Sequence, residues 1–138
     1  MMYRPLLLVG CGKMGGAMLE GWLEMGLAPE QIHIIEPCAP IAEELRNRGL
    51  SAVVAQPELP ADLDPEIVLF AIKPQSMDEA APALAKYRSP NTTFLSIAAG
   101  KTISYFENIL GAEAAIVRSM PNTPAAVRRG ITVATPNT

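Results

Sequence analysis

The stretch PLLLVGCGKMG, residues 5–15, contains the pattern that decides the fold. Its first half is an apolar run typical of a strand buried on both faces, and its second half is a complete G-x-G-x-x-G pattern, Gly10 to Gly15. Residues 14–25 then repeat apolar side chains at helical spacing. A strand, a glycine-rich turn and a helix in this order indicate the first unit of a doubly wound α/β fold.

Each glycine of this turn has its own physical reason. We expect Gly10 to permit the tight turn, Gly12 to let the backbone approach a pyrophosphate, and Gly15 to let the helix pack close to the strand. The start of the helix then offers free N–H groups and the positive end of its dipole to phosphates. The alternative is a structural turn without a ligand. The residues of the predicted phosphate site are Gly10, Cys11, Gly12, Lys13, Met14 and Gly15.

Short apolar runs alternate with helical patterns along the rest of the chain. Strands are expected at residues 5–10, 31–36, 51–54, 66–72, 93–97, 114–119 and 131–134. Helices are expected at 14–25, at 40–48, at 76–87 with a distortion at Pro82, and from Ser104, where Ser104 and Glu107 fit a capping box. This order predicts an α/β fold with a doubly wound, mostly parallel sheet of the Rossmann type and helices on both faces.

The helix at 14–25 has an apolar stripe, which we interpret as the face that packs on the sheet. The residues of this stripe are Met14, Ala17, Met18, Gly21, Trp22 and Met25.

The composition excludes several classes of protein. The 138 residues suit one domain, and the net charge of −3 without a cationic run argues against nucleic-acid binding. The longest apolar runs are too short to span a membrane, so we expect a cytoplasmic protein. Cys11 and Cys38 fit no metal or disulfide pattern and are expected to be reduced thiols, with no metal site. The hydrophobic content of 49% fits either a sheet buried on both faces or a surface covered by something absent.

Glu36 ends the second expected strand, about twenty residues beyond the glycines, where an acidic residue accepts hydrogen bonds from an adenosine ribose. A carboxylate there repels a 2′-phosphate, and residues 37–40 supply no cation to neutralise one. The pattern therefore favours NADH over NADPH. The alternative is a solvated glutamate at a strand end.

Three later stretches point to a family. They are AIKPQ at residues 71–75, SIAAG at 96–100 and RSMPNTP at 118–124, the last followed by Val127 and Gly130. Each is expected at the carboxyl end of a strand, where open α/β sheets bind ligands. Thr123 and Pro124 also suit the start of a short helix. Together with GCGKMGGA at 10–17, these motifs resemble pyrroline-5-carboxylate reductase over essentially the whole chain, and MPNTP is the most specific of them.

The resemblance implies an NAD(P)H-dependent oxidoreductase that reduces 1-pyrroline-5-carboxylate to L-proline, the last step of proline biosynthesis. This chain would supply the cofactor-binding part. No residue is assigned as a catalytic acid or base, and His33, in mid-strand, is expected to be structural. The resemblance places three groups of residues at the cofactor: Ala71, Ile72, Lys73, Pro74 and Gln75 beside its ribose and phosphates, Ala98, Ala99 and Gly100 under the nicotinamide side, and Met120, Pro121 and Asn122 at the nicotinamide ring and substrate.

The chain departs from this family at four positions. Lys13 and Lys101 replace a more usual amide and aliphatic residue, and Lys101 would put a mobile charge beside the nicotinamide end. Gln56 and Glu58 stand where the family often has an asparagine near the adenosine, so that contact is not carried over.

The family also has a C-terminal helical domain that dimerises and completes the substrate site, and this domain is absent here. We therefore expect the full-length protein to form a homo-oligomer through it, and the isolated chain to bind cofactor without turnover. Two alternatives stay open: another Rossmann oxidoreductase, acting on a 3-hydroxy acid or another imine, and a non-enzymatic NAD(P)-binding module.

Overall fold

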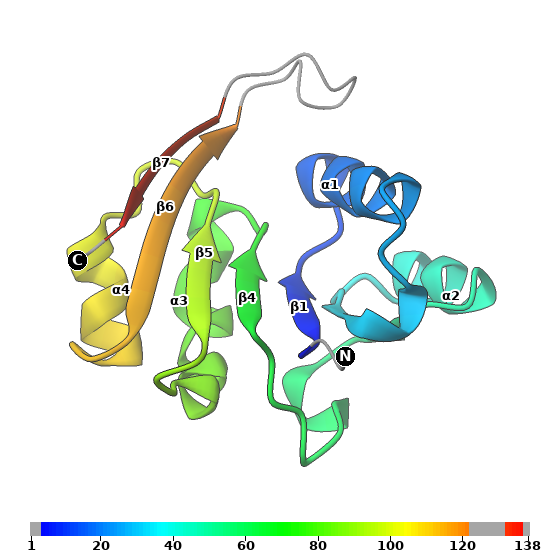
Figure 1. Cartoon of the computed structure of the whole chain (residues 1–138), viewed down its shortest axis with the longest axis horizontal. Helices are drawn as coiled ribbons and strands as arrows, with labels where there is room; N and C mark the ends of the chain where they lie inside the picture. The colour runs from blue at the N-terminus through cyan, green and yellow to red at the C-terminus, as the bar shows by residue number, and fades with distance from the viewer. Residues whose placement is uncertain (1–3, 122–131, 137–138) are drawn as a thin grey trace.

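A computed structural model describes residues 4–121 and 132–136 of the chain. Seven described strands form one sheet in the order β3-β2-β1-β4-β5-β6-β7 (Figure 1). Neighbouring strands from β3 to β6 pair in parallel, and β7 pairs antiparallel to β6. The expected mostly parallel sheet is confirmed. The strands are β1 (Leu6–Val9), β2 (Ile32–Ile35), β3 (Ser51–Val53), β4 (Ile67–Phe70), β5 (Thr93–Ser96), β6 (Ala115–Pro121) and β7 (Thr132–Pro136).

Helices cover both faces of this sheet (Figure 1). Successive residues of a strand point to opposite faces, so Leu7 packs in the core under α3 and α4, and Leu8 in the core under α1 and α2. The α-helices are α1 (Lys13–Glu24), α2 (Ala39–Asn47), α3 (Met77–Ala80) and α4 (Ile103–Leu110). Short 3-10 segments are η1 (Pro29–Gln31), η2 (Gln56–Glu58), η3 (Pro74–Ser76) and η4 (Pro82–Tyr87).

Two expected helices differ from the structure in detail. The helix expected at 76–87 is split into α3 and η4 at Pro82, which has no N–H to donate and whose ring crowds the preceding turn. The prediction of a capping box at Ser104 and Glu107 was wrong. Helix α4 begins one residue earlier, and Thr102 caps it by accepting a 3.0 Å hydrogen bond from the Tyr105 N–H.

The face that α1 buries is rotated from the predicted stripe. Gly15 and Leu19 are its buried residues, whereas Met18 and Trp22 pack at the edge of the core and Met25 is 84% exposed. The rotation follows from the contact of Gly15 with the glycine turn, described below. Periodicity identified the helix correctly but not the line of residues that touches the sheet.

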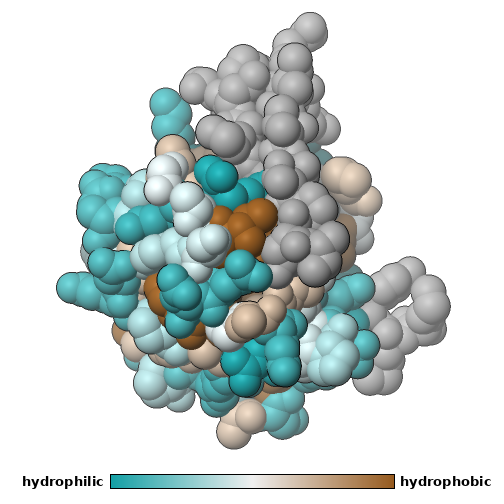
Figure 2. Space-filling model, turned by 90° about the vertical axis from the view of Figure 1, so that its left-hand side faces the viewer, coloured by the Kyte–Doolittle hydropathy of each residue, from teal (hydrophilic) through white to brown (hydrophobic). Residues whose placement is uncertain are grey.

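Met25 is the one large hydrophobic side chain that is exposed among the described residues. Figure 2 shows the face at the β7 and α4 side of the molecule, where polar residues cover most of the described surface. The high apolar content is thus mostly accounted for by a sheet buried on both faces. The described part of the chain contains no helix long and apolar enough to cross a membrane, and no group of three metal-ligating side chains.

Candidate functional site

The glycine turn between β1 and α1 has the close contacts that its sequence predicts. Gly10 has φ +93°, and a Cβ there would lie 2.6 Å from Ile72 Cγ2 and 3.0 Å from the Ala71 carbonyl oxygen. A Cβ on Gly15 would lie 2.4 Å from the carbonyl oxygen of Gly10. These distances are far below van der Waals contact. The reasons given for glycine at these two positions are therefore confirmed.

Gly12 is different, because nothing lies within 4 Å of the position a Cβ would take. It is exposed and directly precedes α1, which no described side chain caps and which has no acidic residue in its first turn. The start of the helix therefore faces open space with free N–H donors and a positive dipole end. A side chain at Gly12 would occupy the space in which a pyrophosphate would sit, so the turn fits such a ligand.

Glu36 is buried, at 7% exposure, and holds the turn in place. One carboxylate oxygen accepts a 2.9 Å hydrogen bond from the Cys11 N–H, and the other a 2.8 Å bond from the Cys38 N–H. Glu36 thus joins the glycine turn to the turn between β2 and α2, and it is not a solvated strand-end residue. Each oxygen keeps acceptor capacity toward a further donor.

The Cys11 thiol lies beside this carboxylate. Burial raises its pKa to about 11, and the neighbouring Glu36 charge adds to the effect. Cys11 is therefore a neutral thiol at physiological pH. Cys38 is exposed, and both thiols are free as expected.

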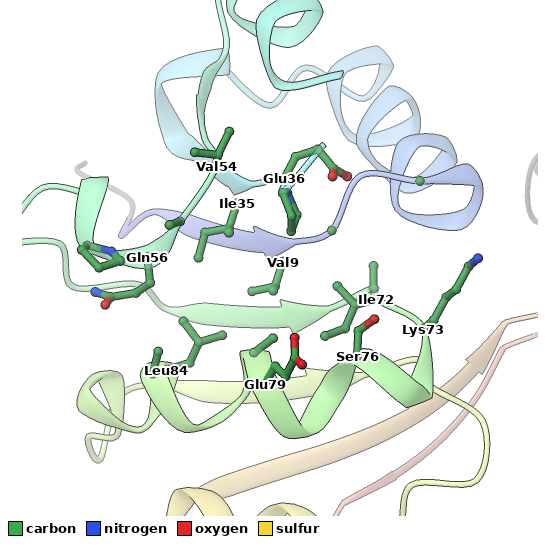
Figure 3. Close-up of a pocket in the computed structure, with 18 residues that line it drawn as sticks. Val9, Ile35, Glu36, Val54, Gln56, Ile72, Lys73, Ser76, Glu79 and Leu84 are labelled. Carbon is green, nitrogen blue, oxygen red and sulfur yellow. The ribbon is translucent and has the colours of Figure 1, made fainter. Parts of the chain in front are cut away.

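A cavity of about 610 Å³ opens at the carboxyl ends of β1, β2 and β4 (Figure 3). Here the strand order reverses, since β2 lies on one side of β1 and β4 on the other. Open α/β sheets bind ligands at this switch point, and the volume is in the range of small-molecule sites. The cavity is lined by Val9, Gly10, Gly12, Ile35, Glu36, Pro37, Val54, Ala55, Gln56, Pro57, Ala71, Ile72, Lys73, Ser76, Glu79, Ala80, Ala83 and Leu84.

Some of the residues that were predicted to bind the cofactor line this cavity. Lys73, its one cationic lining residue among those described, extends at the end near the glycine turn (Figure 3). The predicted residues that line the cavity are Gly10, Gly12, Glu36, Ala71, Ile72 and Lys73. Those outside its lining are Cys11, Lys13, Met14, Gly15, Pro74, Gln75, Ala98, Ala99 and Gly100. Met120 and Pro121 belong to β6, while Asn122 and the helix start at Thr123 and Pro124 lie outside the described residues.

Sequence reasoning missed the wall of the cavity formed by η2 and α3. Gln56 lines the cavity and donates a 3.2 Å hydrogen bond to the Tyr87 hydroxyl, whereas Glu58 does not line it. The position of residues 55–57 after the third strand was an available signal. Glu79, Ala80 and Ala83 had no such signal, because their place depends on how α3 and η4 pack.

Lys101 lies beside the Tyr105 ring of α4, and the effect of its charge on the nicotinamide end stays a prediction. Its Nζ lies 4.3 Å from the centre of the Tyr105 ring, and the Tyr105 hydroxyl donates a hydrogen bond to Asp78. Partial burial and the Asp78 carboxylate raise the pKa of Tyr105 to about 12. His33 lies in β2, half-buried, and burial lowers its pKa; its structural role stays a prediction.

Comparison with known proteins places this geometry in a family. Residues 6–100 match the family described as NADP oxidoreductase, coenzyme F420-dependent. The chain is 34% identical over 131 residues to a pyrroline-5-carboxylate reductase of Escherichia coli (strain K12), an alignment that covers 94% of this chain and 48% of that protein.

Two solved structures share the fold over nearly the whole chain. A pyrroline-5-carboxylate reductase from Coxiella burnetii matches with a TM-score of 0.85 and 26% identity, covering 97% of this chain and 50% of that one. A Plasmodium falciparum pyrroline carboxylate reductase with NADP bound matches with a TM-score of 0.81 and 27% identity. The match covers 100% of this chain and 50% of that one. The chain thus spans about half the length of these relatives. It belongs to the family described as NADP oxidoreductase, coenzyme F420-dependent.

Proposed function

We propose that this chain is the dinucleotide-binding part of an enzyme that reduces 1-pyrroline-5-carboxylate to L-proline with NAD(P)H. The observation that carries the proposal is the cavity at the switch point. Gly12 lines this cavity, and the space that a Cβ of Gly12 would enter is empty. The similarity of nearly the whole chain to the E. coli reductase supports the choice of reaction. The P. falciparum structure, which holds NADP, supports the class of cofactor.

The glycine turn would hold the pyrophosphate. Backbone N–H groups at the start of α1, from Lys13 onward, would donate to its oxygens, and Gly12 would leave room for them. Lys73 would add a positive charge at the same end of the cavity (Figure 3). Beyond the cavity, we propose that Pro74 and Gln75 flank the cofactor, and that two further groups face the nicotinamide and the substrate: Ala98, Ala99 and Gly100, and Met120, Pro121 and Asn122.

Glu36 would face the adenosine ribose and favour NADH over NADPH. Its two hydrogen bonds to backbone N–H groups keep the carboxylate in the wall of the cavity. A 2′-phosphate next to this buried charge would be repelled, and the one described cation of the lining, Lys73, belongs to a different loop, after β4. The remaining acceptor positions suit ribose hydroxyls, which donate.

The hydride for the imine carbon would come from the nicotinamide when the cofactor is bound, and the protein would contribute binding, orientation and exclusion of water. In this chain Glu36 preorganises the turn, so that its donors stand in place before the phosphates arrive. The neutral Cys11 thiol adds no charge there. We further propose that a C-terminal helical domain outside this chain dimerises and completes the substrate site; in support, the chain spans 48% of the E. coli reductase.

Calorimetric titration of the chain with NADH and NADPH tests the proposal, followed by addition of 1-pyrroline-5-carboxylate and measurement of NADH oxidation. We expect binding of both cofactors, tighter for NADH, and no oxidation. Gly12→Val should abolish binding, because the side chain fills the phosphate space; Gly16→Ala, where the new Cβ meets nothing closer than 3.9 Å, is the control.

Unchanged affinity of Gly12→Val would show that the turn is structural only. Saturable oxidation by this chain alone would contradict the proposed need for a second domain.

A further inference from the structure

Glu79 places a second carboxylate at the cavity, apart from Glu36. It belongs to α3, across the cavity from the end of β2, and its side chain leaves the helix on the side of the cavity (Figure 3). No other described residue forms a hydrogen bond or ion pair with it. Its neighbour Asp78, by contrast, accepts from the Tyr105 hydroxyl. Glu79 is thus an exposed acceptor at the cavity with no partner among the described residues, and a ligand in the cavity can donate to it.

The surroundings of Glu79 suit a flat, uncharged ring. The side chains of this part of the wall are mostly apolar, and Gln56 adds one amide, of which one N–H is bonded to the Tyr87 hydroxyl. In such a site, apolar side chains pack against the two faces of a ring, and the few polar groups form hydrogen bonds with the atoms at its edge. The apolar residues here are Val54, Ala55, Pro57, Ala80, Ala83 and Leu84.

The order of groups along a dinucleotide places the base in this slot. With the pyrophosphate at Gly12 and the ribose at Glu36, the next group is the base, which lies farther from the glycine turn, between η2 and α3. The edge of adenine presents a donor, its exocyclic amino group. A 6-keto base such as hypoxanthine presents an acceptor at the same position, which a carboxylate would repel.

We propose that Glu79 accepts a hydrogen bond from the exocyclic amino group of adenine and selects adenine dinucleotides over those with a 6-keto base. This inference rests on the proposed function, in that the adenosine half of the cofactor lies in this cavity. It makes Glu79 a specificity residue that acts on the base, whereas Glu36 acts on the ribose.

The test compares NADH with nicotinamide hypoxanthine dinucleotide (reduced form) in calorimetric titrations of the chain. The wild type should bind NADH roughly tenfold more tightly, the effect of one hydrogen bond to a charged acceptor. Glu79→Gln should bring the two affinities to within about threefold, because an amide can donate to the keto oxygen as well as accept. Glu79→Ala should do the same by removing the acceptor.

Glu58→Gln is the matched control, since it makes the same charge change on an exposed residue of η2 that does not line the cavity. Its ratio of affinities should equal that of the wild type. Melting temperatures of all three variants report whether the fold is retained.

Each failure has its own signature. If the wild type binds NADH but does not discriminate against the hypoxanthine analogue, or if Glu79→Gln and Glu79→Ala keep the wild-type ratio, the role of Glu79 is wrong and the cofactor site stands. If the wild type binds neither dinucleotide, the proposed function fails, and the role of Glu79 fails with it.

Discussion

Replacing Gly15 by alanine should destabilise the protein, although alanine is the better helix former. The added Cβ would lie 2.4 Å from the Gly10 carbonyl oxygen and 3.1 Å from the Ala71 Cβ. The first contact is with backbone, so the turn and α1 have to move apart. Such overpacking destabilises the fold by about 3 kcal/mol, and the higher helix propensity of alanine offsets about 1 kcal/mol of this loss. The expected loss in free energy of unfolding is therefore about 2 kcal/mol, or roughly 5–10 °C in melting temperature for a domain of this size.

Gly16→Ala is the control for this prediction, because it makes the same substitution one position along the same helix. Its Cβ would have the Cys11 carbonyl oxygen as nearest neighbour, at 3.9 Å, an ordinary contact. We expect it to stabilise the chain by about 0.5–1 kcal/mol through helix propensity. Urea unfolding followed by circular dichroism measures both variants. If Gly15→Ala is as stable as Gly16→Ala, the close packing of α1 on the glycine turn is refuted.

Three further predictions concern the surroundings of Glu36. Glu36→Gln should lower the free energy of unfolding by about 1–3 kcal/mol, because the amide NH₂ would face the N–H of Cys11 or Cys38; a melting temperature equal to that of the wild type would contradict this pairing. Iodoacetamide at neutral pH should label Cys38 and spare Cys11, because Cys11 is buried and its pKa is raised to about 11. Mass spectrometry of the peptides measures both labelling rates, and labelling of Cys11 as fast as that of Cys38 would contradict this. The same raised pKa predicts a pH effect: an unfolded chain releases this proton near pH 9.0 and the folded one near 11, so stability should fall between these values, and less so in Cys11→Ala.

The local patterns of the sequence determined most of the fold. Apolar runs and turn residues located every described strand within a few residues, and the glycine pattern predicted the contacts at Gly10 and Gly15. These features depend on residues close together in the chain: a buried strand has to be apolar, and a tight turn under a helix has to lack a Cβ. The Glu36 position, at the end of β2, was also readable from its distance to the glycines.

Only the tertiary structure decided which faces and side chains meet. The rotation of α1 onto Gly15 and Leu19 depends on how closely the helix approaches β1, which its hydrophobic period does not encode. The bonds of Glu36 to Cys11 and Cys38 join two turns, and Glu79 reaches the cavity because α3 packs beside β4. Contacts between segments far apart in the chain depend on the angle and distance of packed elements, and those are set by the whole core rather than by any local stretch.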